Sequence, residues 1–135
     1  MKKLLCLMLT ALLVLSLVGC GRISSAMEIT CDTSQHYTTA DIHDAMDVVQ
    51  SYFRREFNGC TMTALGYAGD EKWSAMEGWA AQFDAREAIV LVSTYESGPS
   101  GGDGALKPNN VYRNYQWILV RNSKGEWEHK THGYG

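Results

Sequence analysis

An apolar run of 15 residues near the N-terminus, from Leu4 to Val18, decides how much of this chain is available to fold. It follows Lys2 and Lys3, and it is shorter than the roughly 20 apolar residues that a membrane-spanning helix needs. A basic start followed by a short apolar run is typical of an export signal peptide, which is removed from the mature protein. We therefore expect residues 1–19 to be cleaved, which leaves 116 of the 135 residues for a single domain.

The apolar run ends in Leu17-Val18-Gly19-Cys20. This tetrapeptide and its position resemble the lipobox of bacterial lipoproteins, a resemblance that covers only the first 21 residues. It implies that the Cys20 thiol receives a diacylglycerol and that the chain is cleaved just before it. We therefore expect Cys20 to hold the protein at the extracytoplasmic face of the cell membrane, since each buried CH₂ contributes about 0.8 kcal/mol. The alternative is an uncleaved anchor or an ordinary cleaved signal in which Cys20 is incidental.

Residues 20–37 are polar, rich in Ser and Thr and without clear periodicity, so we expect a tether between the lipid and the folded body. Once Cys6 and Cys20 are assigned to the signal peptide and the lipid, Cys31 and Cys60 remain. An oxidising compartment favours a bridge between them, which makes this pair a candidate disulfide. The alternative is two free thiols, with Cys60 packed as a small apolar residue.

The overall composition is that of a globular domain, because 45% of the residues are hydrophobic and 20% are charged. This content of apolar and aromatic side chains excludes disorder along the whole chain. The formal charge of −3 becomes −5 without the two lysines of the signal peptide. An acidic chain lacks the basic surface of a nucleic-acid-binding protein, so we expect no nucleic-acid partner.

The folded body, residues 38–135, is predicted to contain a helix, a strand, a short second helix and three more strands. The helix at 39–57 is the best defined, since Thr38 and Asp41 suit a capping box and apolar residues follow at helical spacing. This order predicts an α+β fold in which a long N-terminal helix packs on a curved antiparallel sheet of about four strands. The strands are expected at 60–67, 87–97, 111–121 and 126–131, the second helix from Asp70, and a Gly/Pro-rich loop at 98–110.

The last two strands form a predicted hairpin. A turn at 122–125 puts Arg121 opposite Glu126 and Ile118 opposite His129, although a one-residue bulge would exchange the two faces. His129 and His132 are three residues apart, which on a regular strand points them to opposite faces. A zinc site also needs further ligands, so we expect no metal here.

Three segments carry a second resemblance: Tyr115–Arg121, Trp127–Gly135 and Ser100–Gly104. They resemble a group of small uncharacterised lipoproteins of Gram-positive bacteria, whose domain also occurs at the ends of some membrane-bound regulatory proteins. The resemblance covers roughly 40–135. It implies a cystatin-like or nuclear-transport-factor-2-like fold, and it implies no activity, catalytic residue or cofactor.

The motifs favour binding over catalysis. A phosphate-binding loop needs Gly-Lys-Ser/Thr entering a helix, whereas here Gly104 leads to Ala105-Leu106 and then into a strand. No Cys–His or Ser–His pairing stands out. We therefore expect a non-catalytic, surface-tethered binding module without a cofactor, with an envelope protein or peptide as partner; its oligomeric state stays open. The candidate binding surface combines the loop around Asp103 with Tyr115 and Trp117, and the alternative is that both aromatic residues are plain core.

An alternative function is a small enzyme or ligand carrier that uses a cavity in a cup-shaped sheet. A closed pocket with a strongly perturbed carboxylate or histidine would favour this alternative. A filled core with an exposed aromatic patch would favour the binding module.

Overall fold

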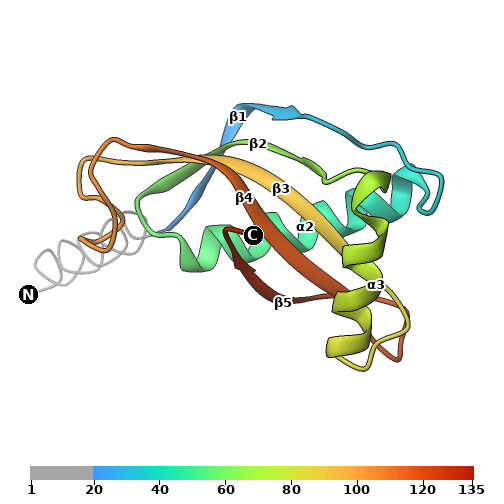
Figure 1. The fold of residues 1–135 in the computed structure, drawn as a ribbon. Helices are drawn as coiled ribbons and strands as arrows, with labels where there is room; N and C mark the ends of the chain where they lie inside the picture. The colour runs from blue at the N-terminus through green and yellow to red at the C-terminus, as the bar shows by residue number, and fades with distance from the viewer. Residues whose placement is uncertain (1–19) are drawn as a thin grey trace, which may run out of the picture.

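The computed structural model describes residues 20–135 as a five-stranded mixed sheet with two α-helices (Figure 1). The expected signal peptide, residues 1–19, lies outside the described residues. The α+β class is confirmed, and no helix within residues 20–135 is long and apolar enough to cross a membrane. In chain order the elements are β1 (Arg22–Ile29), α2 (Thr39–Glu56), β2 (Cys60–Tyr67), a 3-10 turn (Asp70–Lys72), α3 (Trp73–Gln82), β3 (Ala88–Ser97), β4 (Val111–Arg121) and β5 (Trp127–Gly133).

Two details of the expected fold are corrected. The N-terminal helix α2 is of ordinary length, with 18 residues, rather than long, and the sheet has five strands in the order β1-β2-β3-β4-β5 rather than about four. The additional strand β1 pairs parallel with β2, so the sheet is mixed rather than antiparallel. Strand β1 comes from the segment expected to be a tether. Most of its side chains are exposed or half-buried, so its sequence lacks the apolar alternation that marks a strand.

Helix α2 packs its apolar side against one face of the sheet. Its N-terminus carries the expected capping box, in which Asp41 N–H donates to Thr38 Oγ1 at 3.1 Å and Thr38 N–H donates to Asp41 Oδ2 at 3.2 Å. The side chains buried between helix and sheet form the main core: Ile42, Ala45, Met46, Val49 and Phe53 from α2, and Ile89, Leu91, Trp117 and Leu119 from β3 and β4.

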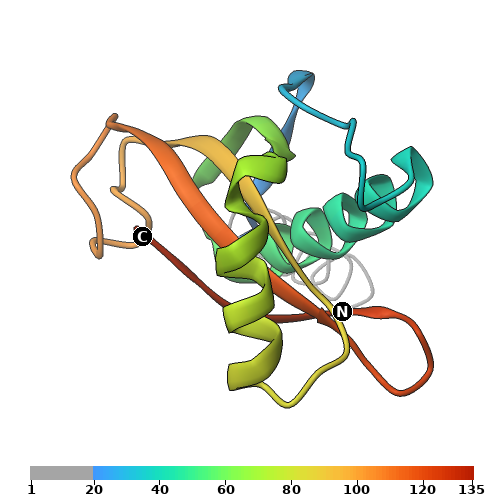
Figure 2. The same ribbon diagram turned by 45° about the vertical axis from the view of Figure 1, so that its right-hand side comes forward.

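Helix α3 covers part of the opposite face. Ala80 of α3 packs with Ala88 of β3 and Val120 of β4 in a second, smaller cluster. Ala88 and Ile89 are successive residues of β3, so their side chains point to opposite faces of the sheet. Since Ile89 belongs to the core beneath α2, Ala88 and the helix α3 that it contacts lie on the other face. Figure 2 shows α3 in front of β3 and β4, with α2 behind them.

The last hairpin differs from the predicted register. Arg121 pairs with Trp127, not Glu126, and Leu119 pairs with His129. The reason is the turn, in which Asn122 N–H donates to the Glu126 carbonyl at 2.9 Å and Gly125 adopts a φ of 79°. A three-residue turn of this kind shifts the register by one residue relative to the four-residue turn that was expected.

The candidate disulfide between Cys31 and Cys60 is not formed, and both thiols are unbridged. Cys60 is the first residue of β2, whereas the Cys31 carbonyl accepts a hydrogen bond of 2.8 Å from the N–H of Tyr67, the last residue of that strand. A strand rises about 3.3 Å per residue, so the two cysteines lie about 20 Å apart. A disulfide requires Cα atoms within about 7 Å, and the fold therefore excludes it.

Candidate ligand-binding pocket

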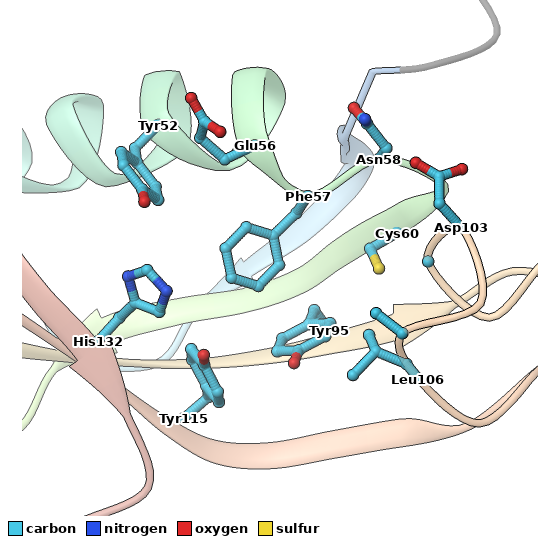
Figure 3. Close-up of a pocket in the computed structure, with 12 residues that line it drawn as sticks. Tyr52, Glu56, Phe57, Asn58, Cys60, Tyr95, Asp103, Leu106, Tyr115 and His132 are labelled. Carbon is cyan, nitrogen blue, oxygen red and sulfur yellow. The ribbon is translucent and has the colours of Figure 1, made fainter.

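A pocket of about 360 Å³ lies between the C-terminal end of α2, the sheet and the Gly98–Asn110 loop (Figure 3). Its walls are mainly aromatic, and its polar lining includes Glu56 and Asp103. Pockets that bind small molecules typically measure about 300–1,000 Å³ and are mainly apolar, so both size and lining suit a small ligand. The aromatic side chains of the lining are Tyr52, Phe57, Tyr95, Tyr115 and His132, and we call this site the aromatic pocket.

The aromatic walls are held by contacts between rings. Phe57 caps the C-terminus of α2 and meets Tyr95 of β3 edge-to-face, with ring centroids 5.4 Å apart. Tyr95 and Tyr115, from neighbouring strands, meet at 5.2 Å and 88°. Edge-to-face aromatic pairs are each worth about 0.5–1.5 kcal/mol beyond their buried area, so these contacts make the walls rigid.

The structure brings together two of the three residues of the expected binding surface. Asp103 and Tyr115 both line the aromatic pocket, from the loop and from β4. Trp117 does not reach the surface, because it is 0% exposed and its Nε1 donates to Ser93 Oγ at 2.8 Å. Trp117 is therefore core, as the alternative interpretation of the sequence had it.

The two histidines of β5 were expected on opposite faces, and this expectation is wrong. His132 Nδ1 lies 3.2 Å from His129 Nε2, so the rings share a face. Leu119 pairs with His129 and Ile118 with Thr131, which leaves Lys130 as an extra residue in a β-bulge. A bulge resets the alternation of side chains along a strand, so residues three apart come to the same side.

Both histidines are shifted toward the neutral form. Burial lowers the pKa of His129 to about 4, and His132 and Arg55 lower it further while a backbone hydrogen bond at Thr131 opposes the shift. Burial also lowers the pKa of His132. The pair is therefore uncharged at neutral pH.

The facing nitrogens of the two rings are His132 Nδ1 and His129 Nε2, and which of them donates depends on the tautomers of the two rings. Figure 3 shows the other side of the His132 ring turned toward the aromatic pocket. In the tautomer that carries the proton on Nδ1, His132 Nε2 is an acceptor for a ligand.

Three tyrosine hydroxyls of the pocket lining take part in none of the hydrogen bonds found within residues 20–135: those of Tyr52, Tyr95 and Tyr115. Tyr95 is only 2% exposed as a residue, and because no buried side-chain N or O atom of the described residues lacks a partner, its hydroxyl is a part that remains accessible. Burial raises the pKa of Tyr95 and of Tyr115, so both hydroxyls keep their protons. Such hydroxyls are available to a ligand as donors and acceptors.

Two imidazoles are too few for zinc, and no group of three or more His, Cys, Asp or Glu side chains suited to a metal occurs in the part of the chain from Cys20 onward. The sequence analysis named His132 but did not place it in a binding site. The only sign of that position was the one-residue bulge that the sequence analysis left open.

Comparison with known proteins finds no matching family, no similar curated protein and no similar solved structure.

Proposed function

We propose that this protein is a lipid-anchored, extracytoplasmic module that binds a small ligand in the aromatic pocket without transforming it. The observation that carries the proposal is the pocket itself, about 360 Å³ in volume and walled by rings that hold one another in place. Its three tyrosine hydroxyls and the outward side of the His132 ring are polar groups that reach the pocket and are open to a ligand.

The position of Cys20 supports anchoring close to this pocket. The next residue, Gly21, is buried, and its N–H donates to the Arg54 carbonyl of α2 at 3.0 Å. Cys20 lines a hollow together with Cys60, and Cys60 also lines the aromatic pocket. A lipid on Cys20 would therefore hold the pocket end of the domain at the membrane surface, and Figure 1 shows the start of β1 at the same end as the loop between β3 and β4.

Within the α+β class, we propose a cystatin-like or nuclear-transport-factor-2-like arrangement. It is supported by the packing of α2 on one face of a twisted sheet, of which β2 to β5 are antiparallel. A helix against one face of such a sheet leaves space at the helix end, where the aromatic pocket lies.

Binding is favoured over catalysis by the placement of the titratable groups. Enzymes with such cavities use a carboxylate in an apolar environment as a base. The two carboxylates of this pocket, Glu56 and Asp103, are both exposed at its rim. The strongly shifted histidine, His129, is not part of the lining and acts on the pocket through His132.

Lipid anchoring is tested by replacing Cys20 with alanine. Cys20→Ala should abolish incorporation of radiolabelled palmitate and move the protein out of the membrane fraction or leave the precursor uncleaved. Cys31→Ala is the matched control, since Cys31 is an unbridged cysteine of the same domain and its replacement should leave the label unchanged. Normal labelling of the Cys20→Ala protein would overturn the anchor.

A further inference from the structure

We infer that the aromatic pocket recognises a small primary or secondary amine attached to an aromatic or other flat apolar group. This inference rests on the proposed function in one respect, that the pocket binds a ligand. Three properties of the pocket lead to this class of ligand: the sign of its charge, the faces of its rings and the direction of its hydrogen-bonding groups.

The charged groups of the pocket are all acidic. Glu56 comes from the last turn of α2 and Asp103 from the loop between β3 and β4, and Figure 3 shows both along one edge of the pocket, with their carboxylates turned outward. The lining formed by the described residues includes no Lys or Arg, and burial keeps His132 neutral at neutral pH. The charges of the lining therefore favour a cation over an anion, while the guanidinium of Arg55 lies outside the lining, over the Tyr52 ring.

The walls suit a cation that carries an apolar group. Tyr52, Phe57 and Tyr115 surround the space beside His132 in Figure 3. The Tyr52 ring already has the Arg55 guanidinium 5.9 Å from its centroid, which leaves Phe57 and Tyr115 for a ligand cation. An ammonium group within about 6 Å of an aromatic ring is attracted to the ring face, and the apolar remainder of the ligand gains by leaving water. Leu106 and Ala105 complete the apolar lining on the loop side.

The hydrogen-bonding groups select an ammonium that has N–H bonds. His132 turns the side of its ring away from His129 toward the pocket, and in the tautomer that carries the proton on Nδ1 its Nε2 accepts a hydrogen bond from a ligand. The Tyr95 hydroxyl is the second such group, since Tyr95 lines the pocket and its hydroxyl, which is not buried, has no hydrogen-bond partner among residues 20–135. A primary or secondary ammonium donates to both oxygen and nitrogen acceptors, whereas a quaternary ammonium has no proton to give.

The experiment compares four probes of one shape by isothermal titration calorimetry on the purified protein: phenethylamine, its N,N,N-trimethyl derivative, 2-phenylethanol and phenylacetate. We expect phenethylamine to bind at least about tenfold more tightly than phenylacetate, because the carboxylate meets Glu56 and Asp103. The alcohol and the trimethyl derivative should each bind more weakly than phenethylamine, since one lacks the charge and the other lacks the N–H.

Variants locate the probe in the pocket. Glu56→Gln and Asp103→Asn should each weaken phenethylamine about threefold while leaving 2-phenylethanol unchanged, as expected for exposed carboxylates. Asp47→Asn is the matched control, because Asp47 is an exposed acid of the same helix outside the pocket. Tyr95→Phe should weaken phenethylamine without unfolding the protein, since the hydroxyl makes no hydrogen bond within residues 20–135.

The outcomes separate this inference from the proposed function. If phenylacetate or 2-phenylethanol binds as tightly as phenethylamine, and Tyr95→Phe weakens it, the pocket is a ligand site but not one for amines. Equal binding of the trimethyl derivative would overturn the role of the N–H bonds. If none of the four probes binds at about 10 mM, which would saturate a site with a Kd of about 1 mM, both the inference and the small-ligand function are overturned.

Discussion

The guanidinium of Arg121 donates from Nη2 to Asp41 Oδ1 at 2.8 Å, across 80 residues of sequence. The same guanidinium donates from Nε to Glu87 at 2.9 Å and lies over the Trp127 ring, 4.1 Å from its centroid. Arg121 thus ties the first turn of α2 to the end of β4, and its side chain holds the pKa of Asp41 below its ordinary value. Arginine suits this position because its planar guanidinium can donate to carboxylates and stack on an aromatic ring at the same time.

Replacing Arg121 should therefore destabilise the domain. Arg121→Gln leaves Asp41 and Glu87 without their cation, and we expect the free energy of unfolding to fall by about 2 kcal/mol. This value is below that of a fully buried pair because both carboxylates are partly exposed. Urea denaturation followed by circular dichroism measures the loss, and Arg113→Gln, an exposed arginine of the same strand, is the control. A loss below about 0.5 kcal/mol would show that the network is marginal.

The histidine pair predicts a pH dependence of stability. The folded state holds the pKa of His129 at about 4, below its ordinary value of 6.5, so the unfolded chain binds the proton more readily. Stability should therefore be complete above about pH 6.5 and fall as the pH decreases toward 4, with a slope of at most about 1.4 kcal/mol per pH unit for one proton. The groups that face His129 are His132, Arg55 and Tyr52, and of these His132 shifts in the same direction.

Urea unfolding at pH 7.5, 6.0 and 5.0 tests this dependence. His129→Gln should flatten the slope between pH 6.5 and 4, because the titrating ring is removed. The lowered pKa of Asp41 acts in a different window, since its contribution is lost only as the pH falls below 3.8. A wild-type protein equally stable at pH 7.5 and 5.0 would contradict the burial of the pair.

The sequence predicted the elements whose signals are local. Helix α2 was expected at 39–57 and is observed at Thr39–Glu56. Its signals are local, because the capping box and the helical spacing of the apolar residues both come from residues of the helix itself and its N-cap. Strand β3 was expected at 87–97 and is observed at Ala88–Ser97, paired with β2 on one side and β4 on the other. The main core of a small domain follows from such periodic segments.

The sequence analysis missed two kinds of feature. One depends on pairing with residues distant in sequence, and the other depends on a one-residue shift in how two strands pair. Strand β1 is held by hydrogen bonds to β2 and exposes most of its side chains, so its composition looks like that of a tether. The bulge at Lys130 has no compositional signal, yet it brings His129 and His132 to one face and so creates a wall of the pocket. A one-residue change of register inverts every side chain beyond it.

Trp117 should behave as a core residue. Its side chain is 0% exposed and packs beside Phe57 with ring centroids 5.3 Å apart, so Trp117→Ala should cost about 3–5 kcal/mol of unfolding free energy. Tyr134→Ala is the control, because Tyr134 is 63% exposed and its loss should change stability by less than about 0.5 kcal/mol. Thermal and urea unfolding of both variants settle the comparison. A stable Trp117→Ala protein would place this residue on the surface after all.

Gly21 should be the residue that joins the anchor to the fold. A Cβ at this position would lie 2.2 Å from the Phe53 carbonyl oxygen and 2.9 Å from that of Phe57, and backbone atoms of a packed helix cannot move aside cheaply. Gly21→Ala should therefore break the 3.0 Å hydrogen bond from Gly21 N–H to the Arg54 carbonyl and reduce stability by about 1–3 kcal/mol. Amide hydrogen exchange should then quicken in β1 before it quickens in β3.

The matched control for this change is another glycine-to-alanine substitution. Gly78 lies in α3, and a Cβ added there meets nothing within 4 Å. Gly78→Ala should therefore raise stability by up to about 1 kcal/mol, because alanine favours a helix over glycine. The two substitutions add the same methyl group and should move the urea midpoint in opposite directions. If Gly21→Ala leaves both the midpoint and the exchange in β1 unchanged, Gly21 does not fasten the start of β1 to α2, and a lipid on Cys20 would hold the domain by a loose tether.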